Sequence, residues 1–99
     1  MKEKCCSKNT KVRNKTDKDK LISHLNRING QINGIKQMVE ESRYCDDILT
    51  QIAAATNSLK SLGLTIMEDH MKTCVKDKIK NGDDEVIDEV MKTFARLSR

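Results

Sequence analysis

The sequence predicts an all-α protein with three helices per chain that assemble into a bundle. Three observations indicate this class. The 99 residues contain no Pro, only 2% of them are aromatic, and apolar residues recur in steps of three and four, as on one face of a helix. A chain this short buries a small share of its surface when it folds alone. We therefore expect long helices that bury their apolar stripes against a second copy of the chain.

A basic arm of residues 1–16 precedes the helices, which form one domain of residues 17–99. Residues 1–20 hold eight Lys or Arg against three acidic residues, whereas residues 21–99 are close to neutral. Concentrated positive charge suits a polyanionic partner such as nucleic acid. The alternative is a solvated, disordered tail without a partner. Cys5 and Cys6 also lie in the arm, as an incidental pair, an accessory metal site or a redox handle.

The first helix is expected over residues 17–42. Its apolar positions alternate in steps of four and three, which is typical of a helix that packs along one seam. This first seam consists of Leu21, Leu25, Ile28, Ile32, Ile35 and Val39. Gly30 and Gly34 lower the helix propensity but permit close approach of another helix. The polar residues 40–43 end the helix.

The second helix is expected over residues 45–80 and the third over residues 84–97. The second carries the most regular seam, in which apolar residues are followed at the same spacing by a His and a Cys. This second seam consists of Cys45, Ile48, Ile52, Ala55, Leu59, Leu62, Ile66, His70 and Cys74. Asn81-Gly82 supplies the stop. The stripe of the third helix consists of Val86, Val90, Phe94 and Leu97.

The segment HMKTC, residues 70–74, places His70 and Cys74 one turn apart on one helix face, as half of a metal site. Cys45 lies on the same seam, but the helix between Cys45 and His70 spans roughly 37 Å, far beyond the ~2 Å of a metal–ligand bond. We therefore expect Cys45 of one chain to join His70 and Cys74 of a second. The chains would then pair as an antiparallel four-helix-bundle dimer with two identical sites.

Two thiolates and one imidazole favour Cu(I), which accepts three soft ligands. Zn(II) with an added water, or Ni(II) and Co(II) with a group recruited from the arm, are the alternatives. Each residue also has a plainer interpretation. Cys45 and Cys74 can be small core residues, and His70 can be a polar residue at the end of a stripe. The joint pattern favours the metal site.

Three segments resemble the copper-sensing operon repressor (CsoR/RcnR) family of bacterial transcriptional repressors. They are RINGQINGI (27–35), RYCDDILTQIAA (43–54) and HMKTC (70–74). The resemblance covers residues 21–97 and implies a dimer that pairs into a homotetramer and binds operator double-stranded DNA without a helix-turn-helix. It also implies that Cys45, His70 and Cys74 bind Cu(I), that binding releases the DNA, and that genes for copper efflux or buffering are then expressed.

The resemblance assigns two further residues near the ligands. Family members carry a Tyr before the first Cys and a Glu on the last helix that hydrogen-bond toward the ligand His. These match Tyr44 and Glu89, with Glu85 as the alternative because of the turn at 81–84. An imidazole that binds metal through one nitrogen keeps the other free to engage such a carboxylate. The plainer interpretations are an interface Tyr and a solvated Glu.

DNA contacts are expected from the arm and the first helix. The candidate residues are Lys11, Arg13, Lys15, Lys18, Lys20, Arg27 and Lys36. Two departures from the family pattern remove charge from the expected DNA surface: His24 stands where many members carry Arg, and Leu64 where some do. Each phosphate that a basic residue neutralises adds salt-dependent affinity, so the arm can compensate.

Other functions stay open as alternatives. Within the family, nickel or cobalt sensors typically add an N-terminal His, which this arm lacks, and persulfide sensors do without the His that His70 provides. The basic arm argues against a metal-buffering bundle that never touches DNA. An enzyme is not expected, because no nucleophile–base pair or phosphate loop is evident. No stretch is apolar enough for a membrane span or a signal peptide, so we expect a cytoplasmic protein.

Overall fold

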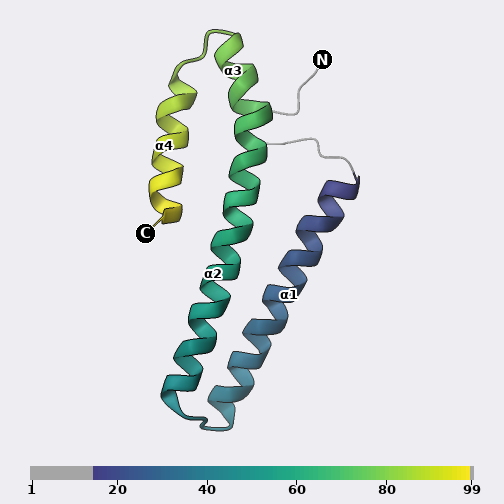
Figure 1. The fold of residues 1–99 in the computed structure, drawn as a ribbon, viewed down its shortest axis with the longest axis vertical. Coiled ribbons are helices and arrows are strands. Elements are labelled where there is room, and N and C mark those ends of the chain that lie inside the picture. Colours follow the sequence, from purple (N-terminus) through teal and green to yellow (C-terminus); the bar gives the residue numbers. More distant parts are fainter. Residues whose placement is uncertain (1–14, 99) are drawn as a thin grey trace. The chain divides into compact units, whose positions relative to one another are not determined.

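The computed structural model describes residues 15–98, and every regular element in this part of the chain is helical (Figure 1). The elements in chain order are α1 (Lys15–Glu40), α2 (Cys45–His70), the π-helical turn η1 (Met71–Val75), α3 (Lys76–Lys80) and α4 (Glu85–Ser98). Because α2, η1 and α3 follow one another without a gap, they form the long helix expected over residues 45–80. The prediction of an all-α chain with three helices is confirmed.

The helix boundaries lie within two residues of those expected. α1 begins at Lys15, a residue expected in the arm, and α4 begins at Glu85. Four residues with an expected or open role lie outside the described part of the chain. They are Cys5, Cys6, Lys11 and Arg13.

Backbone hydrogen bonds hold the turn between α1 and α2 in a Schellman arrangement. The N–H of Arg43 donates to the Met38 carbonyl at 2.9 Å, and the N–H of Ser42 donates to the Val39 carbonyl at 3.1 Å. Ser42 has φ of 55°, the left-handed conformation for which this motif ordinarily uses Gly. α2 therefore starts after a turn whose key position is occupied by a residue with a Cβ.

The same motif ends α3. The N–H of Asp83 donates to the Lys78 carbonyl at 2.8 Å, and the N–H of Gly82 donates to the Ile79 carbonyl at 3.0 Å. Gly82 has φ of 86°, which is the conformation that Gly adopts without strain. The stop predicted at Asn81-Gly82 is therefore confirmed.

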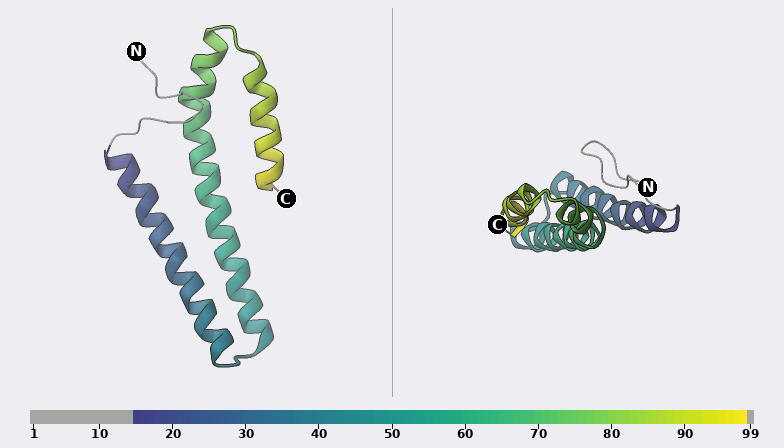
Figure 2. Two further views of the ribbon diagram at one scale, coloured as in Figure 1. Left: turned by 180° about the vertical axis from the view of Figure 1, so that it is seen from behind. Right: turned by 90° about the horizontal axis from the view of Figure 1, so that it is seen from above.

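The chain divides into two compact units, and α2 contributes to both. Within residues 63–98, α4 runs back along η1 and the end of α2 (Figures 1 and 2). Val75, Val86 and Val90 form a buried cluster against which Met67 packs. A Cβ built on Gly63 would lie 2.7 Å from Leu97 Cδ1, so the absence of a side chain at Gly63 lets α4 approach closely.

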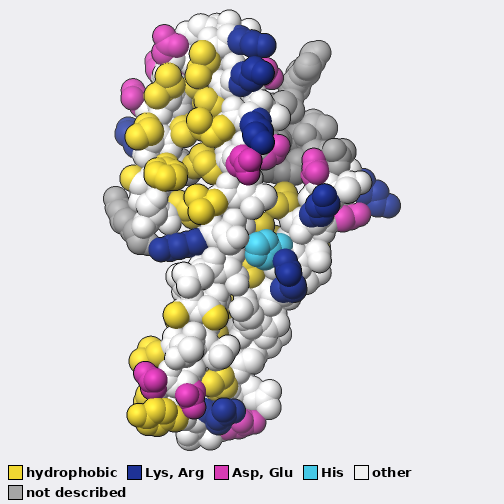
Figure 3. Space-filling view, viewed as in Figure 1, with side chains coloured by type: hydrophobic (Ala, Val, Ile, Leu, Met, Phe, Trp, Pro, Cys, Tyr) yellow, Lys and Arg dark blue, Asp and Glu magenta, His cyan; other side chains and the backbone are white. Residues whose placement is uncertain are grey.

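Many seam residues predicted from the sequence stay exposed in a single chain. Five of them have exposed fractions between 42% and 58%. These residues are Leu25, Ile32, Val39, Ile52 and Leu59. In the unit of residues 63–98, hydrophobic side chains gather over α4 and α3 (Figure 3), where Ile87, Met91 and Phe94 are among those exposed. None of the described helices is long and apolar enough to cross a membrane.

Replacing Ser42 by Gly and Gly82 by Ala should change the free energy of unfolding in opposite directions. A side chain in this conformation costs roughly 1 kcal/mol, so Ser42→Gly should raise the free energy of unfolding and Gly82→Ala should lower it by about 1 kcal/mol. No atom lies within 4 Å of a Cβ built on Gly82, so that loss would reflect backbone conformation alone. Urea unfolding at one fixed protein concentration measures both effects. Destabilisation by both variants would contradict this explanation.

Candidate metal centre

His70 directly precedes the π-helical turn, and Cys74 lies within it. His70 is the last residue of α2 and is half-buried, while Cys74 is the fourth residue of η1 and only 3% exposed. Hydrogen bonds in a π-helix run between residues five apart, and single π-helical turns are frequent at functional sites. Two of the three predicted ligands therefore lie at or in an irregular turn of the long helix.

A side-chain hydrogen bond accompanies this turn. The hydroxyl of Thr73 donates to the carbonyl of Asp69 at 2.8 Å. Such a bond to the carbonyl four residues back competes with the regular backbone pattern and often bends helices. Lys72 and Glu68 also form an ion pair at 3.0 Å, but both groups are exposed, and exposed pairs contribute little.

Cys45, the third predicted ligand, is the first residue of α2 in the other unit of the chain. Its thiol is free and exposed. Tyr44 beside it is 72% exposed, and its carbonyl accepts hydrogen bonds from the N–H groups of Asp47 and Ile48. Cys45 is therefore not buried within the single chain.

The described part of one chain does not bring three ligands together. Cys45 begins α2 and His70 ends it, and no group of three His, Cys, Asp or Glu within residues 15–98 is arranged to hold a metal ion. Cys74 is disulfide-bonded in this structure. It must be reduced to act as a ligand, because the thiolate is the form that binds metal. With Cys74 reduced, the set of two sulfurs and one imidazole fits Cu(I).

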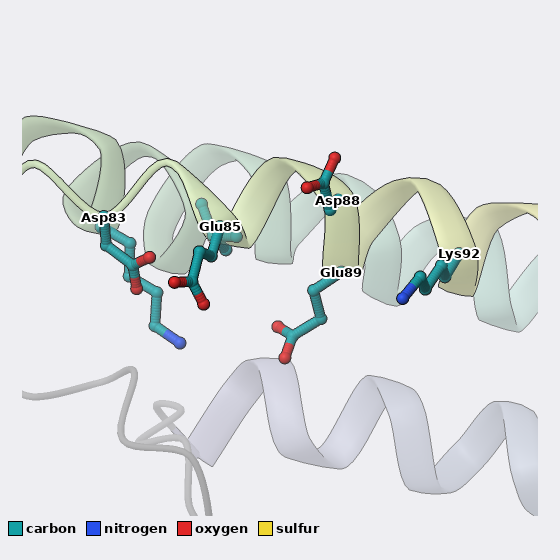
Figure 4. Close-up of a pocket in the computed structure, with 7 residues that line it drawn as sticks. Asp83, Glu85, Asp88, Glu89 and Lys92 are labelled. Atoms are coloured by element: carbon teal, nitrogen blue, oxygen red, sulfur yellow. The ribbon is translucent and has the colours of Figure 1, made fainter.

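The carboxylates considered for a hydrogen bond to His70 lie on α4. Glu85 and Glu89 project from the same side of this helix, one turn apart, whereas Asp88 projects from the other side (Figure 4). Both Glu side chains are exposed and line an open hollow of about 580 Å³. The other residues that line it are Lys78, Asp83, Val86, Asp88 and Lys92. Glu85 and Glu89 thus share one face of α4, and both stay candidates.

The basic residues of α1 fall into two rows on opposite sides of the helix. At ~100° per residue, Lys18 and Lys36 share one angular position and Lys15 lies near them. Lys20 and Arg27 lie on roughly the opposite side. We call these sets the Lys18 row and the Arg27 row. All five side chains are exposed, and the buried Ile28 lies between the two rows, so they flank the apolar seam.

One feature of the centre is missed by the sequence pattern, which predicts a regular α-helix through residues 71–75. This segment contains neither Gly nor Pro, the residues that commonly mark a helix irregularity. The available signal is Thr73, because a Thr inside a helix tends to bond backward to the backbone. The same hydroxyl also lies 3.7 Å from Cys74 Sγ.

Residues 17–96 match the family model described as a metal-sensitive transcriptional repressor. The copper-sensing transcriptional repressor CsoR of Bacillus subtilis (strain 168) is 44% identical over 84 residues, which cover 84% of this chain and 83% of the relative.

Two solved structures are similar to this chain. The copper-sensing repressor CsoR with Cu(I) from Geobacillus thermodenitrificans NG80-2 has a TM-score of 0.81 and 35% identity, over 89% of this chain and 93% of that chain. The nickel-responsive transcriptional regulator InrS has a TM-score of 0.68 and 34% identity, over 80% of this chain and 90% of that chain.

Proposed function

Because the chain belongs to the family of metal-sensitive transcriptional repressors, we propose that it is a Cu(I)-responsive repressor of transcription. The metal-free protein binds operator double-stranded DNA, and binding of Cu(I) releases it, which derepresses genes for copper efflux or homeostasis. The observation that carries this proposal is the donor set Cys45, His70 and Cys74 in a chain whose relatives are copper-sensing repressors. Like its family, the chain is a regulator and not an enzyme. It acts in the cytoplasm, where operator DNA lies.

The metal site forms between two chains. Cys45 of one protomer approaches His70 and Cys74 of its partner when two α2 helices pair antiparallel about a two-fold axis. The exposure of Cys45 supports this arrangement, because a ligand left uncovered by its own chain is available to a second one. The placement of Cys45 and His70 at opposite ends of one continuous helix supports it independently.

The protein works as a homodimer that pairs into a homotetramer. Support comes from the seam residues of α1 and α2 that remain exposed in one chain, such as Leu25, Ile32 and Leu59. Covering apolar surface gains about 25 cal/mol per Å², so a second chain that buries both seams stabilises the assembly. The dimer joins the two halves of each metal site, and the tetramer presents several copies of the basic helix α1 to DNA.

Cu(I) is the inducer that fits the ligands best. A Ni(II) site prefers square-planar or octahedral geometry with more than three donors. The chain has two His, of which His24 lies on α1 and is half-buried. Three soft donors without a further His suit Cu(I), although the similarity to InrS keeps nickel as the alternative to test.

The DNA surface is built from basic residues of α1 and of the arm. Lys15, Lys18, Lys20, Arg27 and Lys36 are exposed, and Lys11 and Arg13 extend the same positive charge along the sequence. The two rows lie on opposite sides of α1, so a DNA duplex that contacts one α1 helix reaches only one of its rows. We assign the DNA contact to the Arg27 row, because Arg27 belongs to the segment RINGQINGI that carries the family resemblance.

Tyr44 and Glu89 couple the metal site to the rest of the protein. Tyr44 lies directly before Cys45 and is exposed, so it is free to meet the partner chain together with that ligand. Glu89 lies on α4, which packs on η1 through the cluster around Val75. A hydrogen bond from the second imidazole nitrogen of His70 to Glu89 would transmit metal binding to α4.

Mixing two defective variants should restore Cu(I) binding if the site lies between chains. The parent should bind one Cu(I) per chain, whereas Cys45→Ala and Cys74→Ala should each lose more than the roughly 10–100-fold in affinity that the loss of an outer hydrogen bond costs. A mixed dimer still contains one complete set of Cys45, His70 and Cys74. Unfolding and refolding an equimolar mixture should therefore recover one tight site per mixed dimer, measured by competition with a chromophoric Cu(I) chelator. Full-strength binding by Cys45→Ala alone would contradict the two-chain site.

Removing charge from the Arg27 row should weaken DNA binding more than removing charge from the Lys18 row. We expect the pair Lys20→Gln and Arg27→Gln to lower operator affinity and to reduce the slope of log K against log salt by about one for each phosphate that is no longer neutralised. Lys18→Gln with Lys36→Gln removes the same charge from the opposite side and serves as the matched control. Gel-shift titrations with and without Cu(I) measure both. Equal losses from both rows would overturn the assignment, and no shift by the metal-free parent at low salt would exclude a repressor.

Replacing the coupling carboxylate should separate metal binding from DNA release. Glu89→Gln should still bind one Cu(I) per chain but lose most of the Cu(I)-dependent fall in DNA affinity, on the order of tenfold or more. Glu85→Gln is the matched control, one turn away on the same face of α4. If Glu85→Gln loses the response and Glu89→Gln keeps it, the coupling role belongs to Glu85.

A further inference from the structure

The hydroxyl of Thr73 faces two acceptors at the metal centre. Its oxygen lies 2.8 Å from the Asp69 carbonyl oxygen and 3.7 Å from Cys74 Sγ. A hydroxyl has one hydrogen, so it donates fully to only one of these acceptors at a time. Which acceptor is preferred depends on the charge that each one carries.

A second Thr on the same long helix shows what this bond does without a sulfur beside it. Thr50 donates to the carbonyl of Asp46 at 2.8 Å, also four residues back and also to an Asp. Thr50 is exposed and lies in the regular part of α2, whereas Thr73 is half-buried and lies in η1. The sulfur contact and the burial therefore distinguish Thr73 from an otherwise matched residue.

The contact with Thr73 matters because Cys74 is a proposed metal ligand and would bind metal as a thiolate. A thiolate accepts a hydrogen bond more strongly than a neutral sulfur, because bonds to a charged acceptor are roughly twice as strong as those between neutral groups. In this structure, where Cys74 is disulfide-bonded, Cys74 and Val75 are each 3% exposed, so the Thr73 hydroxyl is a nearby protein donor at a position with little contact to water. Hydrogen bonds to a ligand atom orient that ligand and tune its affinity for the metal.

We propose that Thr73 is a positioning residue of the Cu(I) site, whose hydroxyl hydrogen turns from the Asp69 carbonyl to the sulfur of Cys74 when that thiolate binds Cu(I). This assignment rests on the proposed function of the chain. The hydroxyl holds the sulfur in one orientation and offsets part of the negative charge that the second thiolate brings to the site. Asp69 keeps its carbonyl in the helix, so the switch needs only a rotation about the Thr73 side chain.

The test compares removal of the hydroxyl with removal of the methyl group. The reduced protein with Cys5→Ser and Cys6→Ser serves as the parent, which removes the other thiols of the arm. Thr73→Val has nearly the shape of Thr but no hydroxyl, and Thr73→Ser keeps the hydroxyl without the methyl group. Thr50→Val removes the matched hydroxyl from α2. Cu(I) affinity is measured by competition with a chromophoric chelator, and the thiolate-to-Cu(I) absorption band in the ultraviolet is recorded for each variant.

We expect Thr73→Val to weaken Cu(I) binding about tenfold and to shift the absorption band, while Thr73→Ser and Thr50→Val match the parent. Thr73→Ala provides a second variant without the hydroxyl in case Val disturbs η1. Parent-like affinity and absorption in both Thr73→Val and Thr73→Ala would overturn the assignment, as would a loss in Thr73→Ser as large as that in Thr73→Val. If the parent itself binds no Cu(I), the proposed function falls and the role of Thr73 falls with it.

Discussion

The continuity of α2 is the constraint on which the proposed metal centre depends. A helix fixes the separation of its ends at about 1.5 Å per residue, and α2 runs without a break from Cys45 to His70. Gly63 is the weakest helix former in α2, yet it is helical. Because Gly63 has no side chain, Leu97 can lie close to its backbone. In the proposed site, two ligands at opposite ends of this helix cannot come from one chain, so a second chain completes the set.

The small core of one chain also favours the proposed assembly of several chains. Few hydrophobic residues among residues 15–98 are buried, and in the unit of residues 63–98 they centre on Val75, Val86 and Val90. Seam residues such as Ile32 and Leu59 are still more than half exposed. When folding, association and ligand binding bury the same surfaces, each stabilises the others by mass action. In the proposed assembly, stability therefore depends on association and on metal binding as well as on the fold of one chain.

Apolar spacing predicts the helices and nearly all their boundaries, because the steps of three and four belong to the sequence itself. Gly82 can be predicted as a stop from its lack of a Cβ, whereas Ser42 takes the same conformation with no comparable signal. The proposed ligand types and their separation along α2 also come from the spacing. The π-helical turn is not, because the Thr73 bond that accompanies it also occurs at Thr50, where the helix stays regular. The choice between Glu85 and Glu89 also escapes prediction, since both lie on one face of α4.

If the exposed Cys45 serves a site shared by two chains, as proposed, the abundance of the protein becomes part of its response. With ligands drawn from two chains, an isolated chain has no complete site and cannot sense the metal, however much copper is present. The threshold for gene expression is then set jointly by the copper level and by the concentration at which chains associate. A cell that makes little of this protein would lose repression and copper sensitivity together, so control over its own synthesis would adjust both at once.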